Sequence, residues 1–165
     1  STSIFKGDHV MQSGGYVIAG TASGATHLGV FNGCFYIDPT SKKPTWSNYY
    51  TQTNTTSSGS ISGGTNIDAY IYDDPYMLFE AQCDGTIAKT DIGKNTDSVL
   101  TTGSTVTGQS KNEIDDGTEA TTAGLQVKII GITKDPENDD ASSANANWHI
   151  MFNEHVKLGT GITGT

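Results

Sequence analysis

Two of the four histidines lie on one expected strand, but too far apart to share a metal ion. His149 and His155 are six residues apart on the same face of an expected strand. A rise of about 3.3 Å per residue separates them by roughly 20 Å, which is too far for one metal ion. Asn153 and Lys157 share that face, so we expect both histidines to face solvent. The other two histidines are His9 and His27.

An acidic loop from Asp135 to Asp140 supplies four closely spaced carboxylates, from Asp135, Glu137, Asp139 and Asp140. Such hard oxygen ligands are the raw material of a calcium site. The loop lacks the turn glycine and the closing glutamate of an EF-hand. Because acidic loops of acidic proteins are usually only solvated, we expect no metal, with calcium in this loop as the alternative. The run Asp115-Asp116-Gly117 is a weaker candidate.

No catalytic motif stands out in the sequence. It contains neither a GxSxG nucleophile elbow, nor a GxxxxGK[ST] phosphate loop, nor an HExxH zinc helix. Asp73 and Asp74 would face opposite ways in an extended chain, so turn chemistry explains this pair better than acid–base catalysis. A carboxylate pair assembled from distant strands stays open, but the sequence favours a protein without enzymatic activity or cofactor.

Aromatic residues after Pro44 are the candidates for contact with a partner. Trp46, Tyr49 and Tyr50 lie where the strand pattern ends. Exposed rings of this kind stack on sugars or anchor a protein interface. They could equally cap one end of a barrel or sandwich. We take these three residues, together with Phe5, as the candidate interface.

The charge balance excludes several classes of partner. The chain has nine lysines, no arginine and 18 acidic residues, for a net charge of −9. Arginine binds phosphate groups through two parallel hydrogen bonds, and the chain has none. Binding to nucleic acid is therefore strongly disfavoured, and the negative charge disfavours binding to an anionic membrane surface as well. No apolar run approaches the length of a membrane span.

The elements that must position these residues are strands. Apolar and polar residues alternate, broken by Gly, Asp and Asn. In GLQVKIIGIT, we expect Gln126 and Lys128 to face away from the core. In NWHIMFNEHVKL, the expected core face continues to Val156 and Leu158. Besides Val156 and Leu158, the residues of these two segments expected in the core are Leu125, Val127, Ile129, Trp148, Ile150 and Phe152.

A turn at Asp73-Asp74-Pro75 divides the next segment into two strands, because proline lacks a ladder donor and restricts the residue before it. After the turn, Met77, Phe79, Ala81 and Cys83 share an apolar face. Asp84-Gly85 predicts a type I′ hairpin into residues 86–90.

The two cysteines, Cys34 and Cys83, are 49 positions apart with no metal-binding or redox spacing around them. Cysteine is often buried as a small hydrophobic residue. We therefore favour two buried free thiols over one disulfide.

These patterns predict one all-β domain over residues 1–165, a small barrel or sandwich with long polar loops. Only the segment from Lys89 to Leu100 could hold a helical turn. We expect a possible flexible arm at residues 1–6 and a possible flexible tail at residues 159–165. The polar loops are expected at Thr51–Thr65, Thr101–Ser110 and Lys134–Asn147.

The stretch from His27 to Tyr50 allows two structures. Asn32-Gly33 is a hairpin signal, but its flanks are apolar on both faces. We favour one strand from Leu28 to Ile37 with a bulge at Gly33, followed by a turn from Asp38 through Pro44. The residues expected in the core are then Phe31, Cys34 and Phe35.

The order of segments carries a resemblance. IFKGDHVM, GVFNGCFY, YDDPYMLFEAQ, IGKNTDSV, TGQS and LQVKIIGITKDPEND follow one another over Ile4 to Gly159. In type and order they resemble structural proteins of tailed bacteriophages, many of them marine, that decorate the head.

The resemblance implies a non-enzymatic all-β module on the outer surface of the capsid. It also implies a homotrimer that bridges neighbouring subunits of the major capsid protein. Another virion part, such as a tail or fibre component, is an alternative. From a different class, the alternative is a carbohydrate-binding β-sandwich, with Trp46, Tyr49 and Tyr50 as the platform and calcium in the Asp135–Asp140 loop.

Overall fold

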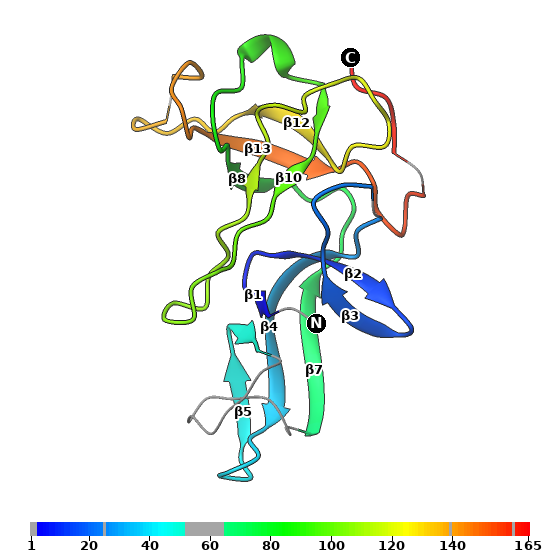
Figure 1. The fold of residues 1–165 in the computed structure, drawn as a ribbon, viewed down its shortest axis with the longest axis vertical. Helices are drawn as coiled ribbons and strands as arrows, with labels where there is room; N and C mark the ends of the chain where they lie inside the picture. Colours follow the sequence, from blue (N-terminus) through cyan, green and yellow to red (C-terminus); the bar gives the residue numbers. More distant parts are fainter. Residues whose placement is uncertain (1–2, 25, 52–64, 139, 160) are drawn as a thin grey trace. The chain divides into compact units, whose positions relative to one another are not determined.

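The computed structural model describes residues 3–24, 26–51, 65–138, 140–159 and 161–165. Over these residues the chain is all-β, which is consistent with a sandwich-like fold, and its antiparallel sheets form no closed barrel (Figure 1). The predicted fold class is therefore confirmed, and its barrel alternative is wrong. Among the described residues, no helix is long and apolar enough to cross a membrane.

The chain forms two compact units, each assembled from three separate segments. Unit 1 comprises Ser1–Gly20, Leu28–Asp73 and Thr102–Lys111. Unit 2 comprises Thr21–His27, Asp74–Thr101 and Asn112–Thr165. The chain passes from unit 1 to unit 2 at the predicted Asp73-Asp74-Pro75 turn, where the Asp74 carboxylate accepts a hydrogen bond from the Tyr76 N–H (2.9 Å).

Unit 1 is built around one long strand, β4 (Gly29–Ile37). The sheet runs in the order β3-β2-β4-β5, and β7 pairs with β4 as well, so that β4 lies between β5 and β7 (Figure 1). A short pair, β1 with β6, completes the unit. The bounds of the other strands are β1 (Ile4–Phe5), β2 (His9–Ser13), β3 (Tyr16–Ala19), β5 (Pro44–Ser47), β6 (Tyr49–Tyr50) and β7 (Thr65–Tyr72).

The single strand with a bulge is confirmed. The register between β4 and β7 shifts between Phe31 and Gly33, and Gly33 has a φ of 135°. The extra residue changes which side chains point inward, because a shift of one residue reverses the two faces of a strand. Phe31 and Cys34 are buried as expected, but Phe35 is only half-buried and Tyr36 takes its place in the core. The turn lies where it was predicted, closed by the Asp38 N–H and the Lys43 carbonyl (2.9 Å).

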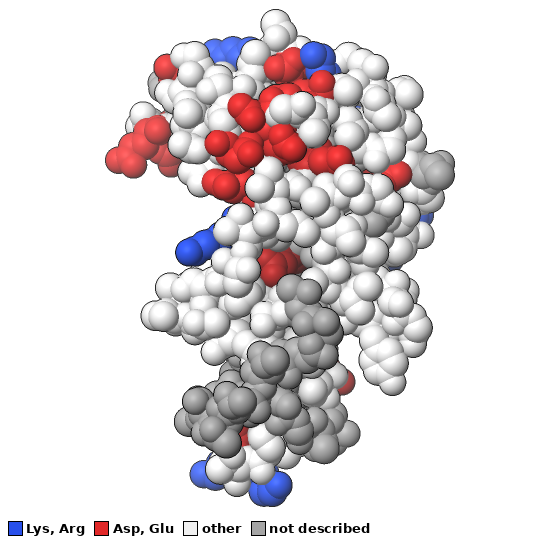
Figure 2. Space-filling view, viewed as in Figure 1, with Lys and Arg blue, Asp and Glu red and all other residues white. Residues whose placement is uncertain are grey.

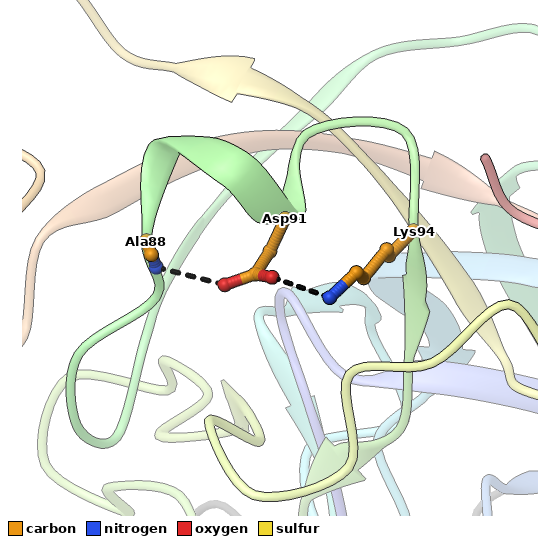
Figure 3. Close-up of polar contacts among 3 residues, drawn as sticks. All are labelled: Ala88, Asp91 and Lys94. Atoms are coloured by element: carbon orange, nitrogen blue, oxygen red, sulfur yellow. Dashed lines mark hydrogen bonds and ion pairs between the residues drawn. The ribbon is translucent and has the colours of Figure 1, made fainter.

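Unit 2 contains a four-stranded sheet in the order β8-β13-β12-β9. Strands β10 and β11 form a separate two-stranded sheet. The helical element among the described residues of unit 2 is a 3₁₀ turn, η1 (Lys89–Asp91), within the segment predicted to hold one. The Asp91 carboxylate accepts the Ala88 N–H (3.1 Å) and pairs with the Lys94 ammonium (2.7 Å; Figure 3). The strands are β8 (Phe79–Gln82), β9 (Asn95–Thr96), β10 (Ser98–Val99), β11 (Glu113–Ile114), β12 (Val127–Ile132) and β13 (Asn147–Phe152).

Strand β13 is shorter than its alternating pattern predicts. It ends at Phe152, and the chain then turns, with the Leu158 and Gly159 N–H groups both bonded to the His155 carbonyl. Val156 and Leu158 are therefore exposed rather than buried, while His155 and Asn153 are buried rather than solvent-facing. The pattern failed here because alternation describes side chains only while the backbone stays extended.

The predicted hairpin at Asp84-Gly85 is wrong. Gly85 has no positive φ, which a type I′ turn requires, and residues 86–88 form no strand. The Thr86 N–H bonds instead to the Asp116 carboxylate (2.9 Å). The alternation before this point is confirmed: Met77, Phe79 and Ala81 are half-buried, between exposed neighbours, and Cys83 is fully buried.

Buried amides organise the interior of unit 2. Gln126, expected to face solvent, is fully buried and donates to the Thr21 carbonyl (2.6 Å) while accepting from the Ser98 N–H (3.2 Å). Asn153 donates to two carbonyls and accepts the Ile162 N–H (2.9 Å). These bonds tie the end of the chain to the unit, so the described part of the predicted flexible tail is held in place.

Candidate functional site

Aromatic side chains gather on one face of the sheet formed by β5, β4 and β7 in unit 1. Phe35 lies directly opposite Trp46, and Gly33 directly opposite Tyr70. Tyr72 points to the same side as Tyr70, because they are two residues apart on one strand. Trp46, Tyr70 and Tyr72 expose 45, 49 and 45% of their surface. We call Phe35, Trp46, Tyr70 and Tyr72 the aromatic face.

The rings of the aromatic face are held by their neighbours. A Cβ atom at Gly33 would lie 2.5 Å from Cζ2 of Trp46, so the indole ring covers the backbone of the bulge. The indole N–H donates to Oδ1 of Asn48 (3.1 Å), and the Tyr70 ring meets the Trp46 ring edge-on at 5.1 Å and 62°. A tryptophan fixed in this way loses little side-chain entropy when a partner covers it.

Charge is divided unevenly between the units. Unit 1 contains four lysines and four aspartates, so its formal charge is zero. Unit 2 contains five lysines and fourteen acidic residues, which account for the whole net charge of −9. Figure 2 shows the acidic side chains gathered in unit 2. On the outward side of β7, Asp68 is the single charged residue, opposite Phe35.

The aromatic group predicted from the sequence is not assembled. Tyr49 stacks on Phe5 at 5.6 Å and 12°, and Tyr50 packs against the core. Phe5 is a correction: only 2% of its surface is exposed, because the pairing of β1 with β6 turns it inward. Trp46 alone joins the aromatic face. Tyr70 and Tyr72 were not predicted, although the alternation in AYIY places them on one face.

A second group of interest is an acidic cluster in unit 2. Carboxylate oxygens of Asp84, Asp115 and Asp116 lie within 4.8 Å of one another, and among the described residues this is the set suited to a metal ion. The described residues of the Asp135–Asp140 loop, where calcium was the alternative to the expected absence of metal, form no such set, and Asp139 lies outside the described residues.

The carboxylates of this cluster already bind backbone N–H groups. Asp84 accepts from the Asp116 N–H (3.0 Å), Asp116 from Thr86, and Asp115 from the Gly117 N–H (2.7 Å). Burial, followed by the nearby charges of Asp91 and Asp116, raises the pKa of the Glu119 carboxyl beside them. The cluster thus orders two loops and concentrates negative charge.

Both cysteines are free and buried, as predicted. Burial raises the pKa of the Cys34 and Cys83 thiols to about 11. Because the thiolate is the reactive form, neither residue is poised for nucleophilic or redox chemistry at neutral pH.

Two histidines lie in the interior of unit 2. His27 and His155 are both fully buried, and their segments pair in parallel. The Phe152 ring stacks on His27 at 5.1 Å and contacts His155 at 5.9 Å. Nδ1 of His155 accepts the Lys157 N–H (3.1 Å), so this ring shapes the turn that follows β13. The predicted exposure of His155 is wrong, and His149 is half-buried.

Compared with models of protein families, with curated proteins and with solved structures, the chain gives no match. The features that bear on function are therefore the aromatic face, the division of charge and the resemblance carried by the order of segments.

Proposed function

We propose that the chain is a non-enzymatic structural protein of a bacteriophage virion. In this proposal it decorates the outer surface of the assembled head and stabilises the contacts between subunits of the major capsid protein. The observation that carries the binding role is the exposed aromatic face on a unit without net charge. The choice of the bacteriophage head as the binding partner follows from the resemblance.

The aromatic face has the features of a protein-binding surface. Tryptophan and tyrosine are enriched among the residues that dominate binding energy, above all where neighbouring groups hold them in place. Trp46 is held by Asn48 and by the Gly33 backbone. The rings of Trp46 and Tyr70 are inclined by 62°, so they do not form the flat platform that would suit a sugar chain.

The division of charge suits this attachment. A face with Asp68 as its single charge can be covered without burying unpaired charges, which is costly. The acidic unit 2 keeps its surface hydrated and repels both nucleic acid and other copies of itself. We therefore assign capsid attachment to unit 1.

The proposed mechanism is thermodynamic linkage. A protein that binds only the assembled, expanded lattice stabilises that lattice, by about 2.7 kcal/mol per site at a free concentration one hundred times Kd. Several attachment points on one oligomer raise avidity without requiring strong single contacts. The homotrimer implied by the resemblance stays a prediction, and it is the alternative to the dimer inferred below.

The decisive test is binding to heads. Expanded heads that lack the protein are mixed with it and sedimented, and their thermal stability is measured. We expect the wild type to sediment with the heads and to raise their disruption temperature. Trp46→Ala should weaken this binding, whereas Tyr76→Ala, which removes an exposed tyrosine of unit 2, should not.

Two results would contradict the proposal. The first is no binding to heads together with binding to a glycan array, which would favour the carbohydrate-binding alternative. The second is a location on tails or fibres when the virion is imaged by electron microscopy.

A further inference from the structure

Among the described residues, one edge of strand β7 is unpaired, and it is longer than the other unpaired edges of unit 1. It pairs with β4 along one side, and no described strand pairs with its other side (Figure 1). β7 has eight residues, whereas β3 and β5, which also have one open edge among the described strands, have four each. β5 also begins with Pro44, which cannot donate to a ladder.

Sequence features that protect edge strands are missing from β7. Natural edges are shortened, or carry lysine or proline. β7 contains neither residue, and its one charge is Asp68. Ile67, Ala69, Tyr70 and Tyr72 are exposed, so that apolar surface lies on both faces of the strand. An added strand would continue the backbone ladder and place its own side chains beside apolar ones on both faces.

The charges indicate which occupant fits this edge. β7 offers no cation to a nucleic acid, and a strongly charged strand would bury its charges against tyrosines. A second copy of unit 1 brings no net charge, whereas any contact between two copies of unit 2 opposes two charges of −9. Self-association through unit 1 is therefore the arrangement with the least repulsion.

We propose that β7 pairs with β7 of a second copy, antiparallel and around a two-fold axis centred on Tyr70. Directly opposite residues of antiparallel strands share a face, so this register places each Asp68 opposite Tyr72 of the other copy. The two carboxylates are thereby kept apart. The aromatic faces of both copies lie on the same side and join into one surface across the new strand pair.

The available area sets the strength of this pairing. An aromatic side chain buries 150–250 Å², so the exposed halves of Tyr70 and Tyr72, the rings on β7 itself, supply at most roughly 200 Å² per copy. Stable interfaces bury about 800 Å² per partner. The dimer should therefore be weak and depend on concentration. This inference does not depend on the decoration function.

Sedimentation velocity of the full chain over a wide range of concentration tests the pairing. We expect a monomer–dimer equilibrium, with β7 amides becoming protected from hydrogen exchange as the concentration rises. Ala69→Lys places a charge on the open edge and should weaken association about tenfold or more. Ile18→Lys, on edge strand β3, is the matched control and should associate like the wild type. Thermal melting confirms that both variants fold.

The outcomes separate this inference from the decoration function. A monomer at every concentration, a trimer, or a dimer whose β7 amides stay unprotected would overturn the β7 pairing. So would a dimer that Ile18→Lys disrupts and Ala69→Lys does not. Head binding is measured separately. A chain that dimerises through β7 but does not bind heads would support the pairing and contradict the decoration function.

Discussion

The indole ring of Trp46 covers the backbone of Gly33 on the neighbouring strand, in a space that no side chain at Gly33 could share. The bulge in β4 creates that space, and glycine permits the φ of 135° found there. An exposed indole of unit 1 is therefore positioned by the least bulky residue of its central strand.

Gly33→Ala should destabilise the protein by about 2–4 kcal/mol, because it adds backbone strain and displaces the Trp46 ring. Urea denaturation followed by circular dichroism measures the change. Gly124→Ala is the control, since a Cβ atom there meets nothing within 4 Å and needs no positive φ. Equal stability of the two variants would contradict the observed position of the indole.

Asn153→Ala should cost about 2–4 kcal/mol, because it leaves the Ala123 and Leu125 carbonyls and the Ile162 N–H without their buried partner. We also expect carboxypeptidase to remove the last residues faster. Lys134→Ala, on an exposed loop, should change neither property. An unchanged rate of digestion would mean that other bonds hold the end of the chain.

Glu119→Gln should stabilise the protein at neutral pH. The pKa of Glu119 is raised in the folded state, so the folded protein binds the proton more tightly than the unfolded chain and loses stability as pH rises through that pKa. Because the group is partly exposed, the gain should be below about 1 kcal/mol. It should disappear below the carboxyl's ordinary range near pH 4, as read from urea denaturation at both pH values. Glu137→Gln serves as the control for removing a charge on an exposed loop.

The two thiols should react slowly with a disulfide reagent while the protein is folded. Burial hides Cys34 and Cys83 and keeps them protonated, with pKa values of about 11. Both should react at once after denaturation. An added thiol in Ser23→Cys, at an exposed position, should react in the folded state. Fast reaction of the wild type would indicate frequent opening of the units.

Local patterns in the sequence predicted the strands well. The bulge at Gly33 and the turn at Pro75 depend on glycine and proline, whose backbone preferences act within a few residues. The exchange of Phe35 for Tyr36 in the core was not foreseen, because the position of an extra residue inside a strand decides which face each later side chain takes.

The site residues were harder to predict, because contacts between distant segments create them. Phe5 is buried by the pairing of β1 with β6, more than forty residues along the chain. Asp84 meets Asp116 because a bridge between Cys83 and Ile114 brings their loops together. Neither contact has a local signature. Trp46 was found because an exposed tryptophan beside a proline is informative by itself.

The route of the chain has a consequence for how the protein can be inherited and dissected. The backbone changes unit five times, so no continuous stretch of the gene encodes either unit alone. Neither unit 1 nor the acidic unit 2 can be exchanged as one continuous segment. Recombination that preserves the fold must transfer the whole chain.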